Sequence, residues 1–242
     1  MGRRRPVVVA IEGISGAGKS TLVARAAAEF GWSPLAEAYD RLDPRPAIGV
    51  RTPPALARIE RRLLDEERRR FENARALVRH GATVLADTGF LGPLTYTAGL
   101  AALGVVPRPM TTALLARTRR WARAGRWGAP DAIVYLATRA PTRRRRAKRD
   151  PARHPPALAV RHERVGLLEE RFYATTVTRL LPGRLLRLDG ERPIDRLVPA
   201  LGRIVRRAVP LADRARTALR LLDGFAEFPS EERPPRAGAG NR

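Results

Sequence analysis

The sequence predicts an α/β fold in which helices cover a parallel sheet of about five strands. The first observation is that short apolar runs alternate with longer segments of helical periodicity along the 242 residues. The second is that the run at residues 7–11 is fully apolar and rich in β-branched residues, as in strands buried on both faces. The third is that no internal repeat and no linker divides the chain, whose length suits one large domain.

The predicted strands are short and lie between the predicted helices. The first one, residues 7–11, is fully apolar, whereas the second is the weakest of the set. The strand segments are residues 7–11, 35–38, 82–87, 132–136 and 185–190.

The predicted helices are longer and carry apolar residues at helical spacing. In the longest, a charged gap near Glu67 interrupts an apolar face that runs from Leu56 to Val78. Gly31 and Gly81 end two of these helices, as helix-terminating glycines commonly do. The helical segments are residues 19–30, 55–80, 93–103, 111–124, 161–180, 194–209 and 211–222, and residues 229–242 have the composition of a disordered tail.

The composition excludes several classes of protein. Cysteine is absent, which excludes disulfides, thiolate catalysis and cysteine-based metal sites and suits a reducing compartment. No run of about 18 apolar residues is present, so we expect no membrane span and a cytoplasmic location. The histidines His80, His154 and His162 are scattered, without the spacing of a metal site.

The formal net charge of +23 raises the question of nucleic acid. Of 47 basic residues only Lys19 and Lys148 are lysines, and Ala, Gly and Pro are also abundant, as in a chain shaped by biased codon usage. Many arginines stand beside acids on helical segments, where i,i+4 pairs are expected. We therefore do not take the charge as the signature of a nucleic-acid surface.

The segment from Gly13 to Ser20 matches the pattern G-x-x-x-x-G-K-[ST], with a predicted strand before it and a helix after it. Glycines let successive backbone N–H groups point at phosphate oxygens, and the helix adds the positive end of its dipole. Lys19 then reaches the β- and γ-phosphates, while the Ser20 hydroxyl is a hard ligand for Mg²⁺. The segment predicts a phosphate-binding loop for ATP.

Other segments narrow the class of nucleotide-binding protein. The chain has no Asn-Lys-x-Asp for guanine, is too short for a motor or helicase core, and lacks an apolar strand that ends in Asp-Glu. Among the classes of protein with a phosphate-binding loop, the sequence therefore favours a small-molecule kinase.

The loop "IEGISGAGKST" resembles that of the thymidylate kinase and deoxynucleoside kinase group of P-loop kinases. The order and spacing of "TVLADTGF", "FLGPLTY", "PDAIVYLATRAPTRRRRAKR" and "LEERFYATTVTRLLPGRLLRLDG" extend the resemblance over residues 6–207. It implies a three-layer P-loop fold over residues 1–209, an Arg-rich lid near residues 139–155, and a C-terminal extension over residues 210–242. It also implies transfer of the γ-phosphoryl group of Mg-ATP to a (deoxy)nucleoside or a nucleoside monophosphate.

The resemblance assigns roles by position. Asp87, at the end of the third strand, would lie near Mg²⁺ with Ser20. Glu37 stands where the family keeps a carboxylate base, with Asp40 as its rival. The lid arginines would stabilise charge on the transferred group: Arg143, Arg145, Arg146 and Arg149. The phosphates of ATP would contact Gly13, Ser15, Gly16, Ala17, Gly18, Lys19, Ser20 and Thr21.

Three positions depart from the family pattern. Thr88 replaces the arginine that follows the family aspartate, and Ser15 stands where thymidylate kinases have Asp. Residues 40–55 are Pro-rich and match no segment of the family. These departures bear on the acceptor, which could also be a non-nucleoside hydroxyl compound.

Several alternatives stay open from the sequence. A regulatory P-loop ATPase could use the basic segments to grip nucleic acid or another protein. Tyr96, Trp121 and Trp127 are candidates either for the wall of an acceptor pocket or for core packing. Residues 211–222 are expected to form a packing helix or the contact of a homodimer.

Overall fold

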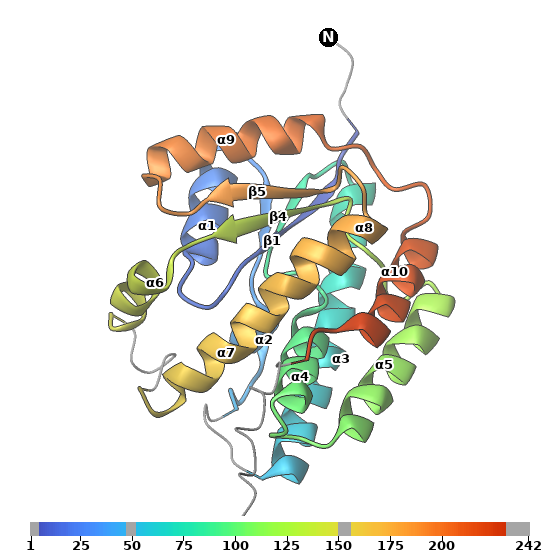
Figure 1. Cartoon of the computed structure of the whole chain (residues 1–242). Coiled ribbons are helices and arrows are strands. Elements are labelled where there is room, and N and C mark those ends of the chain that lie inside the picture. Colours follow the sequence, from blue (N-terminus) through green and yellow to red (C-terminus); the bar gives the residue numbers. More distant parts are fainter. Residues whose placement is uncertain (1–4, 47–51, 150–155, 231–242) are drawn as a thin grey trace, which may run out of the picture.

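The computed structural model of the chain describes residues 5–46, 52–149 and 156–230, and its centre is an all-parallel sheet (Figure 1). The sheet has five strands in the order β2-β3-β1-β4-β5, which confirms the predicted fold class. The strands are β1 (Val8–Glu12), β2 (Ser33–Leu35), β3 (Val84–Asp87), β4 (Ala132–Ala137) and β5 (Leu185–Asp189).

Helices connect and cover these strands. The longest is α3 (Pro53–Arg79), whose first turn carries two prolines where no backbone donor is needed. The others are α1 (Lys19–Phe30), α2 (Ala38–Arg41), α4 (Gly92–Ala102), α5 (Arg108–Arg123), α6 (Ala140–Ala147), α7 (Pro156–Phe172), α8 (Thr178–Leu180), α9 (Ile194–Arg207) and α10 (Arg214–Asp223).

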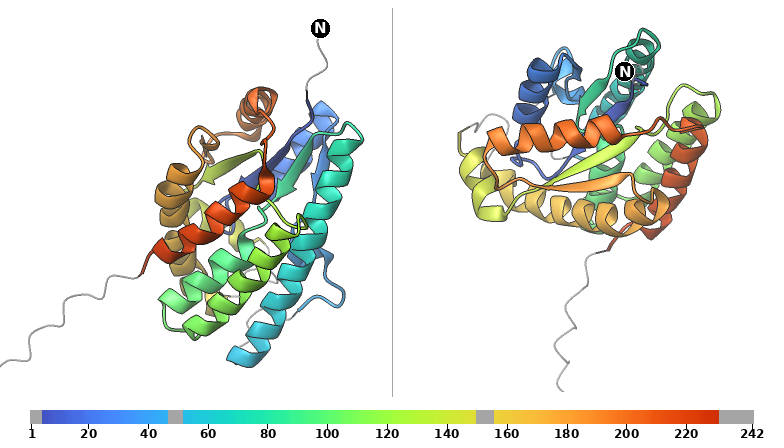
Figure 2. Two further views of the ribbon diagram at one scale, coloured as in Figure 1. Left: turned by 90° about the vertical axis from the view of Figure 1, so that its right-hand side faces the viewer. Right: turned by 90° about the horizontal axis from the view of Figure 1, so that it is seen from above.

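The sheet separates two apolar layers, because alternate residues of each strand point to opposite faces. Val9 and Ile11 of β1 belong to a core with residues of α1 and α9. Val8 and Ala10 belong to the other core, which α3, α4, α5 and α10 complete. The two views of Figure 2 show α1 and α9 on one side of the sheet and the larger group of helices on the other.

The chain order reverses at β1, which pairs with β3 on one side and with β4 on the other. In an open parallel sheet, ligands bind outside the carboxyl ends of the strands at such a switch point. The register brings Ile11 opposite Asp87 and Glu12 opposite Tyr135 at that edge. The fold therefore gathers β-strand ends from three distant segments around the predicted phosphate loop.

Two predicted elements differ from the structure. The second strand covers Ser33–Leu35 instead of residues 35–38, and Ala38 already begins α2. Pro34 has no backbone N–H to donate and is tolerated because β2 is an edge strand. Since proline is otherwise rare in strands, the sequence pattern did not indicate a strand at this position. The single helix expected over residues 161–180 is α7, a π-helical turn (Tyr173–Val177) and α8.

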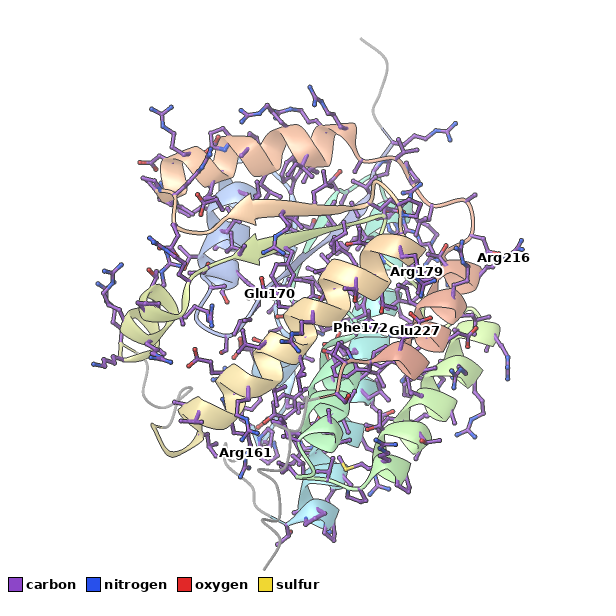
Figure 3. The ribbon with its side chains drawn as sticks, in the orientation of Figure 1. Arg161, Glu170, Phe172, Arg179, Arg216 and Glu227 are labelled. Atoms are coloured by element: carbon purple, nitrogen blue, oxygen red, sulfur yellow. The ribbon has the colours of Figure 1, made fainter. Side chains whose placement is uncertain are left out.

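The C-terminal extension packs into the same core as the rest of the chain. Phe172 at the end of α7 stacks against Phe225 and Phe228, at ring-centroid distances of 4.7 and 5.1 Å. Arg179 and Glu227 form an ion pair beside this cluster (Figure 3). Residues 211–222 thus supply a packing helix, whereas the predicted tail beyond residue 230 and residues 47–51 and 150–155 lie outside the described residues.

Asp131, fully buried before β4, ties the extension to the sheet. Its carboxylate accepts hydrogen bonds from the backbone N–H of Val8 and of Leu211, both at 2.7 Å. It also pairs with the guanidinium of Arg214, on α10. The side chain of Asp131, directly before β4, therefore joins β1, the backbone at Leu211 and α10.

Substitution of Asp131 by alanine is expected to destabilise the fold by about 3–5 kcal/mol, since Arg214 loses its buried partner and two amides lose their acceptor. Urea unfolding followed by circular dichroism measures this loss. Arg216→Ala removes an exposed arginine from the same helix, where Figure 3 shows the side chain pointing outward, and should change stability by less than about 0.5 kcal/mol. Equal unfolding midpoints for Asp131→Ala and the wild type would contradict the anchoring role.

Among residues 5–46, 52–149 and 156–230, no helix has both the length and the apolar character of a membrane span.

Candidate active site

The predicted phosphate-binding loop lies between β1 and α1. Three of its glycines have positive φ angles: 144° at Gly13, 79° at Gly16 and 99° at Gly18. Left-handed backbone of this kind is strained for residues with a Cβ, so the glycines allow the loop to curl. Lys19 is the first residue of α1, and its Nζ donates a hydrogen bond to the Gly13 carbonyl at 2.9 Å.

Close approach also explains two of these glycines. A Cβ at Gly13 would stand 2.7 Å from the carbonyl oxygen of Leu136, and one at Gly16 would stand 3.0 Å from that of Arg143. Gly166 plays the same part on α7, where a Cβ would stand 2.7 Å from the Ile14 side chain. The loop is therefore enclosed by β4, α6 and α7, and side chains at these positions would push the enclosing elements apart.

The loop opens into a cavity of about 720 Å³, which is large enough for a nucleotide and a small acceptor. The remaining walls come from α2, α3, α4 and α7. All of the predicted phosphate-contacting residues line this cavity: Gly13, Ser15, Gly16, Ala17, Gly18, Lys19, Ser20 and Thr21.

Of the two candidates for the base, Glu37 lies in the cavity wall. It precedes α2 as the N-cap residue and is half-buried. Asp40 is not among the residues that line the cavity, and its carboxylate lies 3.9 Å from the guanidinium of Arg45. The geometry therefore favours Glu37 over Asp40 for contact with a bound acceptor.

Asp87 ends β3 next to β1, and its side chain is buried. Its position in the strand puts it on the same face as Leu85, which packs in the core with α1. Its Oδ1 has no hydrogen-bond partner among the described residues, and Asp87 is not among the residues that line the cavity. The hydroxyl of Ser20, exposed on the first turn of α1, is a suitable ligand for Mg²⁺. The described ranges hold no group of three acidic or histidine side chains that could bind a metal alone.

Thr88, at the position where the resemblance expects arginine, is the only non-glycine residue with positive φ in the described ranges, at 63°. Arg70 of α3 reaches this turn instead. Its guanidinium donates hydrogen bonds to the carbonyls of Asp87 and Thr88 at 2.8 and 3.1 Å, and pairs with Glu67. A buried arginine from another element thus holds the turn whose own arginine is missing.

The predicted lid arginines on and beside α6 occupy different environments. Arg146 lines the cavity and donates hydrogen bonds to the carbonyls of Ala17 and Gly190, at 2.6 and 3.1 Å. Arg149 also lines the cavity and is exposed. Arg143 is buried, donates a hydrogen bond to the Thr138 carbonyl and is not among the lining residues.

The last residue of β1, Glu12, is a buried carboxylate that no sequence pattern indicated. Glu12 accepts a hydrogen bond from the hydroxyl of Tyr173 at 2.7 Å and one from the backbone N–H of Gly89 at 2.9 Å. Burial raises its pKa, and the hydrogen bond from Tyr173, the nearby charge of Lys19 and the Gly89 N–H offset part of that shift. Glu12 lines the cavity directly before the phosphate loop.

Two further carboxyl groups that the sequence did not single out line the cavity: Glu60 of α3, which is buried, and Glu169 of α7, which is half-buried. Burial, together with the charge of Glu169, raises the pKa of Glu60 to about 8. Burial raises the pKa of Glu169 to about 7, although the Thr95 hydroxyl donates a hydrogen bond to it at 2.8 Å. Glu67, beside Arg70, has its pKa raised by burial to about 7. The cavity wall therefore carries three carboxyl groups with raised pKa values.

The pKa of Glu60 predicts how stability depends on pH. Since the folded protein holds this proton up to about pH 8 and the free side chain loses it near 4.5, stability falls as pH rises across this interval. Glu60→Gln cannot ionise and should gain about 1–3 kcal/mol over the wild type between pH 5 and pH 8. Glu169 and Tyr96 face the same carboxyl group and remain in the variant.

Thermal unfolding at several pH values, with Glu29→Gln on the exposed face of α1 as control, measures this difference. A gap between Glu60→Gln and the wild type that stays constant from pH 5 to pH 8 would show that Glu60 does not titrate in this range.

The gap near Glu67 was the one signal in the sequence for the acidic wall. Glu60, Glu67 and Arg70 interrupt the apolar face of α3 and are all buried, because that face meets a cavity as well as a core. Glu12, Glu169 and Tyr173 left no such signal.

The aromatic candidates separate in the structure. Tyr96 lines the cavity and makes an edge contact with the His162 ring, at a centroid distance of 5.9 Å. Trp127 is buried in the core, and Trp121 stacks under the guanidinium of Arg117. Only Tyr96 of the three therefore contributes to the cavity wall.

The parallel sheet with its switch point, the glycine loop and the lysine at the start of α1 together define a P-loop nucleotide-binding fold. Solved structures resemble it closely. Deoxyadenosine kinase from M. mycoides with bound dATP matches with a TM-score of 0.67 at 16% identity, covering 82% of this chain and 98% of that chain.

The same kinase with bound dCTP matches with a TM-score of 0.66, and with the products dCMP and dCDP with 0.63, at the same identity and coverage. The chain therefore has the fold of the P-loop deoxynucleoside kinases. No protein-family model and no curated protein sequence matches it.

Proposed function

We propose that this protein is an ATP-dependent phosphotransferase that moves the γ-phosphoryl group of Mg-ATP to a hydroxyl group of a small molecule, most simply a (deoxy)nucleoside. One observation carries the proposal: the phosphate loop and the carboxylate of Glu37 line one cavity. A phosphate grip and a base that faces it are what in-line transfer to a hydroxyl requires.

The residues divide the work by position. The loop amides and Lys19 bind the β- and γ-phosphates, and Arg146 and Arg149 face them from the lid side. Mg²⁺, held by Ser20 with Asp87 behind it, would neutralise charge on the phosphates. Glu37 orients the acceptor hydroxyl and takes its proton. The enclosing helices α3, α4 and α7 exclude water from the acceptor.

The acidic wall favours an unphosphorylated acceptor over a nucleoside monophosphate. An acceptor phosphate would share the cavity with Glu60, Glu67 and Glu169, and each of these groups would repel it when ionised. The departure at Ser15 points the same way, away from a thymidylate kinase. The names of the similar structures, which describe a deoxyadenosine kinase, also support a nucleoside acceptor.

A screen of ADP release tests the proposal, with Mg-ATP and sets of nucleosides, nucleoside monophosphates and hydroxyl compounds such as sugars and aminocyclitols. Consumption of ATP should rise with an unphosphorylated hydroxyl compound and produce its phosphate, detected by mass spectrometry. The net charge of +23 favours one rival, a polymer-stimulated ATPase. Stimulation by RNA or DNA alone, with binding that weakens steeply with salt, would favour that rival and contradict the kinase.

A further inference from the structure

The cavity wall formed by α3, α4 and α7 carries the carboxyl groups of Glu60 and Glu169, and no cation among the described residues lowers the pKa of Glu60. We propose that it binds a positively charged nitrogen group, an alkylammonium or amidinium, carried by the phosphoryl acceptor. The inference rests on the proposed function in calling this ligand the acceptor, and within that function it favours a hydroxyl compound that also carries a cationic nitrogen over an ordinary (deoxy)nucleoside.

Glu60 carries the first part of the argument. Its side chain is 2% exposed and lines the cavity, and its Oε2 has no hydrogen-bond partner among the described residues. A buried carboxyl oxygen without a hydrogen-bond partner destabilises the fold, and it does so more strongly when the group is charged. Such an atom in the wall of a cavity is the expected sign of a hydrogen-bond donor that arrives with a ligand.

Glu169 carries the second part. It lies on α7, and its charge raises the pKa of Glu60. Both carboxyl groups also raise the pKa of Tyr96 on α4. The Tyr135 hydroxyl, a further buried group in the cavity wall, also has no partner among the described residues. Two buried polar atoms of the cavity wall, the Glu60 Oε2 and the Tyr135 hydroxyl, therefore lack a partner among the described residues.

The basic residues of the cavity leave the pKa values of both carboxyl groups raised. Lys19, which is hydrogen-bonded to Gly13, lowers the pKa of Glu169, but this pKa stays at about 7. Arg146 is bonded to Ala17. Arg161 lies in the amino-terminal half of α7 (Figure 3), and its charge lowers the pKa of Tyr96. The pKa of Glu60 nevertheless stays raised to about 8. No cation among the described residues lowers the pKa of Glu60.

A cationic ligand fits this arrangement. An ammonium group has three N–H donors and no acceptor, and an amidinium offers two parallel donors to a carboxylate. Binding of the cation would lower the pKa of Glu60, so that the carboxyl group releases its proton to solvent and pairs with the ligand as a carboxylate. Tyr96 adds an aromatic wall that a cation can contact.

Direct binding measured by calorimetry at pH 7.5 without ATP tests this inference. The probes are three pairs that differ in a protonated amine: D-glucosamine with D-glucose, streptamine with scyllo-inositol, and 3′-amino-3′-deoxyadenosine with adenosine. The amine member of at least one pair should bind at least about 10-fold more tightly, since a charge-assisted hydrogen bond contributes about 1.5–3 kcal/mol. In Glu60→Gln this preference should fall below about threefold, whereas Glu29→Gln, outside the cavity, should keep it.

Absence of an amine preference in all three pairs would overturn the inference, and so would a preference that survives in Glu60→Gln. The Glu60→Gln protein is expected to fold, because glutamine has the same size, and its thermal unfolding checks this. The result is independent of phosphoryl transfer: Lys19→Ala should lose Mg-ATP binding and keep the amine preference. If the protein preferred the amines but neither bound nor consumed ATP, the proposed function would be refuted. The inference that the cavity binds a cationic nitrogen group would still hold.

Discussion

Lys19→Ala is expected to abolish ATP-dependent turnover and to weaken Mg-ATP binding severely. Lys19 is the first residue of α1, and its ammonium already lies at the mouth of the loop, bonded to the Gly13 carbonyl at 2.9 Å. Loss of the point charge on the β- and γ-phosphates removes stabilisation that grows during transfer, so we expect a decrease in kcat of about 10³-fold or more. Calorimetry with Mg-ATP and the rate of ADP release measure the two effects.

The chain offers a matched control, because its other lysine, Lys148, is exposed and does not line the cavity. Lys148→Ala should bind Mg-ATP as the wild type does. Unchanged turnover in Lys19→Ala, or equal losses in both variants, would refute the phosphate-binding role of the loop.

Glu37→Gln is expected to lower kcat by about 10²–10⁴-fold, the usual contribution of a general base, and to leave the Kd for Mg-ATP within about threefold. Glutamine keeps the size and hydrogen-bonding reach of the side chain but cannot accept the proton of the acceptor hydroxyl. The reaction measured is ATP consumption with the best acceptor of the screen.

Asp40→Asn is the control for this variant, since Asp40 stands three residues away beside Arg45 and outside the cavity wall. It should retain most of the wild-type kcat. A loss confined to Asp40→Asn would move the base to that residue, and equal kcat values in the wild type and Glu37→Gln would leave Glu37 without a catalytic role.

The phosphate loop was fully readable from the sequence because its geometry is local. Gly13, Gly16, Gly18 and Lys19 act through backbone torsions and helix position within one short segment, and all of them lie where the pattern predicts. The strands β1, β3 and β4 were readable for a similar reason: strands buried on both faces are apolar runs whatever their neighbours. The edge strand β2, with Pro34, follows no such rule and was placed too late in the chain.

The acceptor end was not readable, because it is assembled from α3, α4 and α7, which contribute residues far apart in the sequence. The Glu60 and Glu169 carboxyls lie close enough to influence one another only after the helices pack on the sheet. Arg70 likewise reaches the turn at Thr88 from a different element, so the absence of the family arginine in the sequence gave no hint of a replacement.

The amino-acid sequence by itself determined the α/β class and the conformation of the glycine-rich loop before α1, since each depends on periodicity or on backbone freedom within a few residues. Tertiary structure alone decided which carboxylates are buried together, that Glu37 and not Asp40 lines the cavity, and that the C-terminal helix joins the core. The physical reason is that burial and electrostatic coupling depend on distance in space, which a linear pattern does not contain.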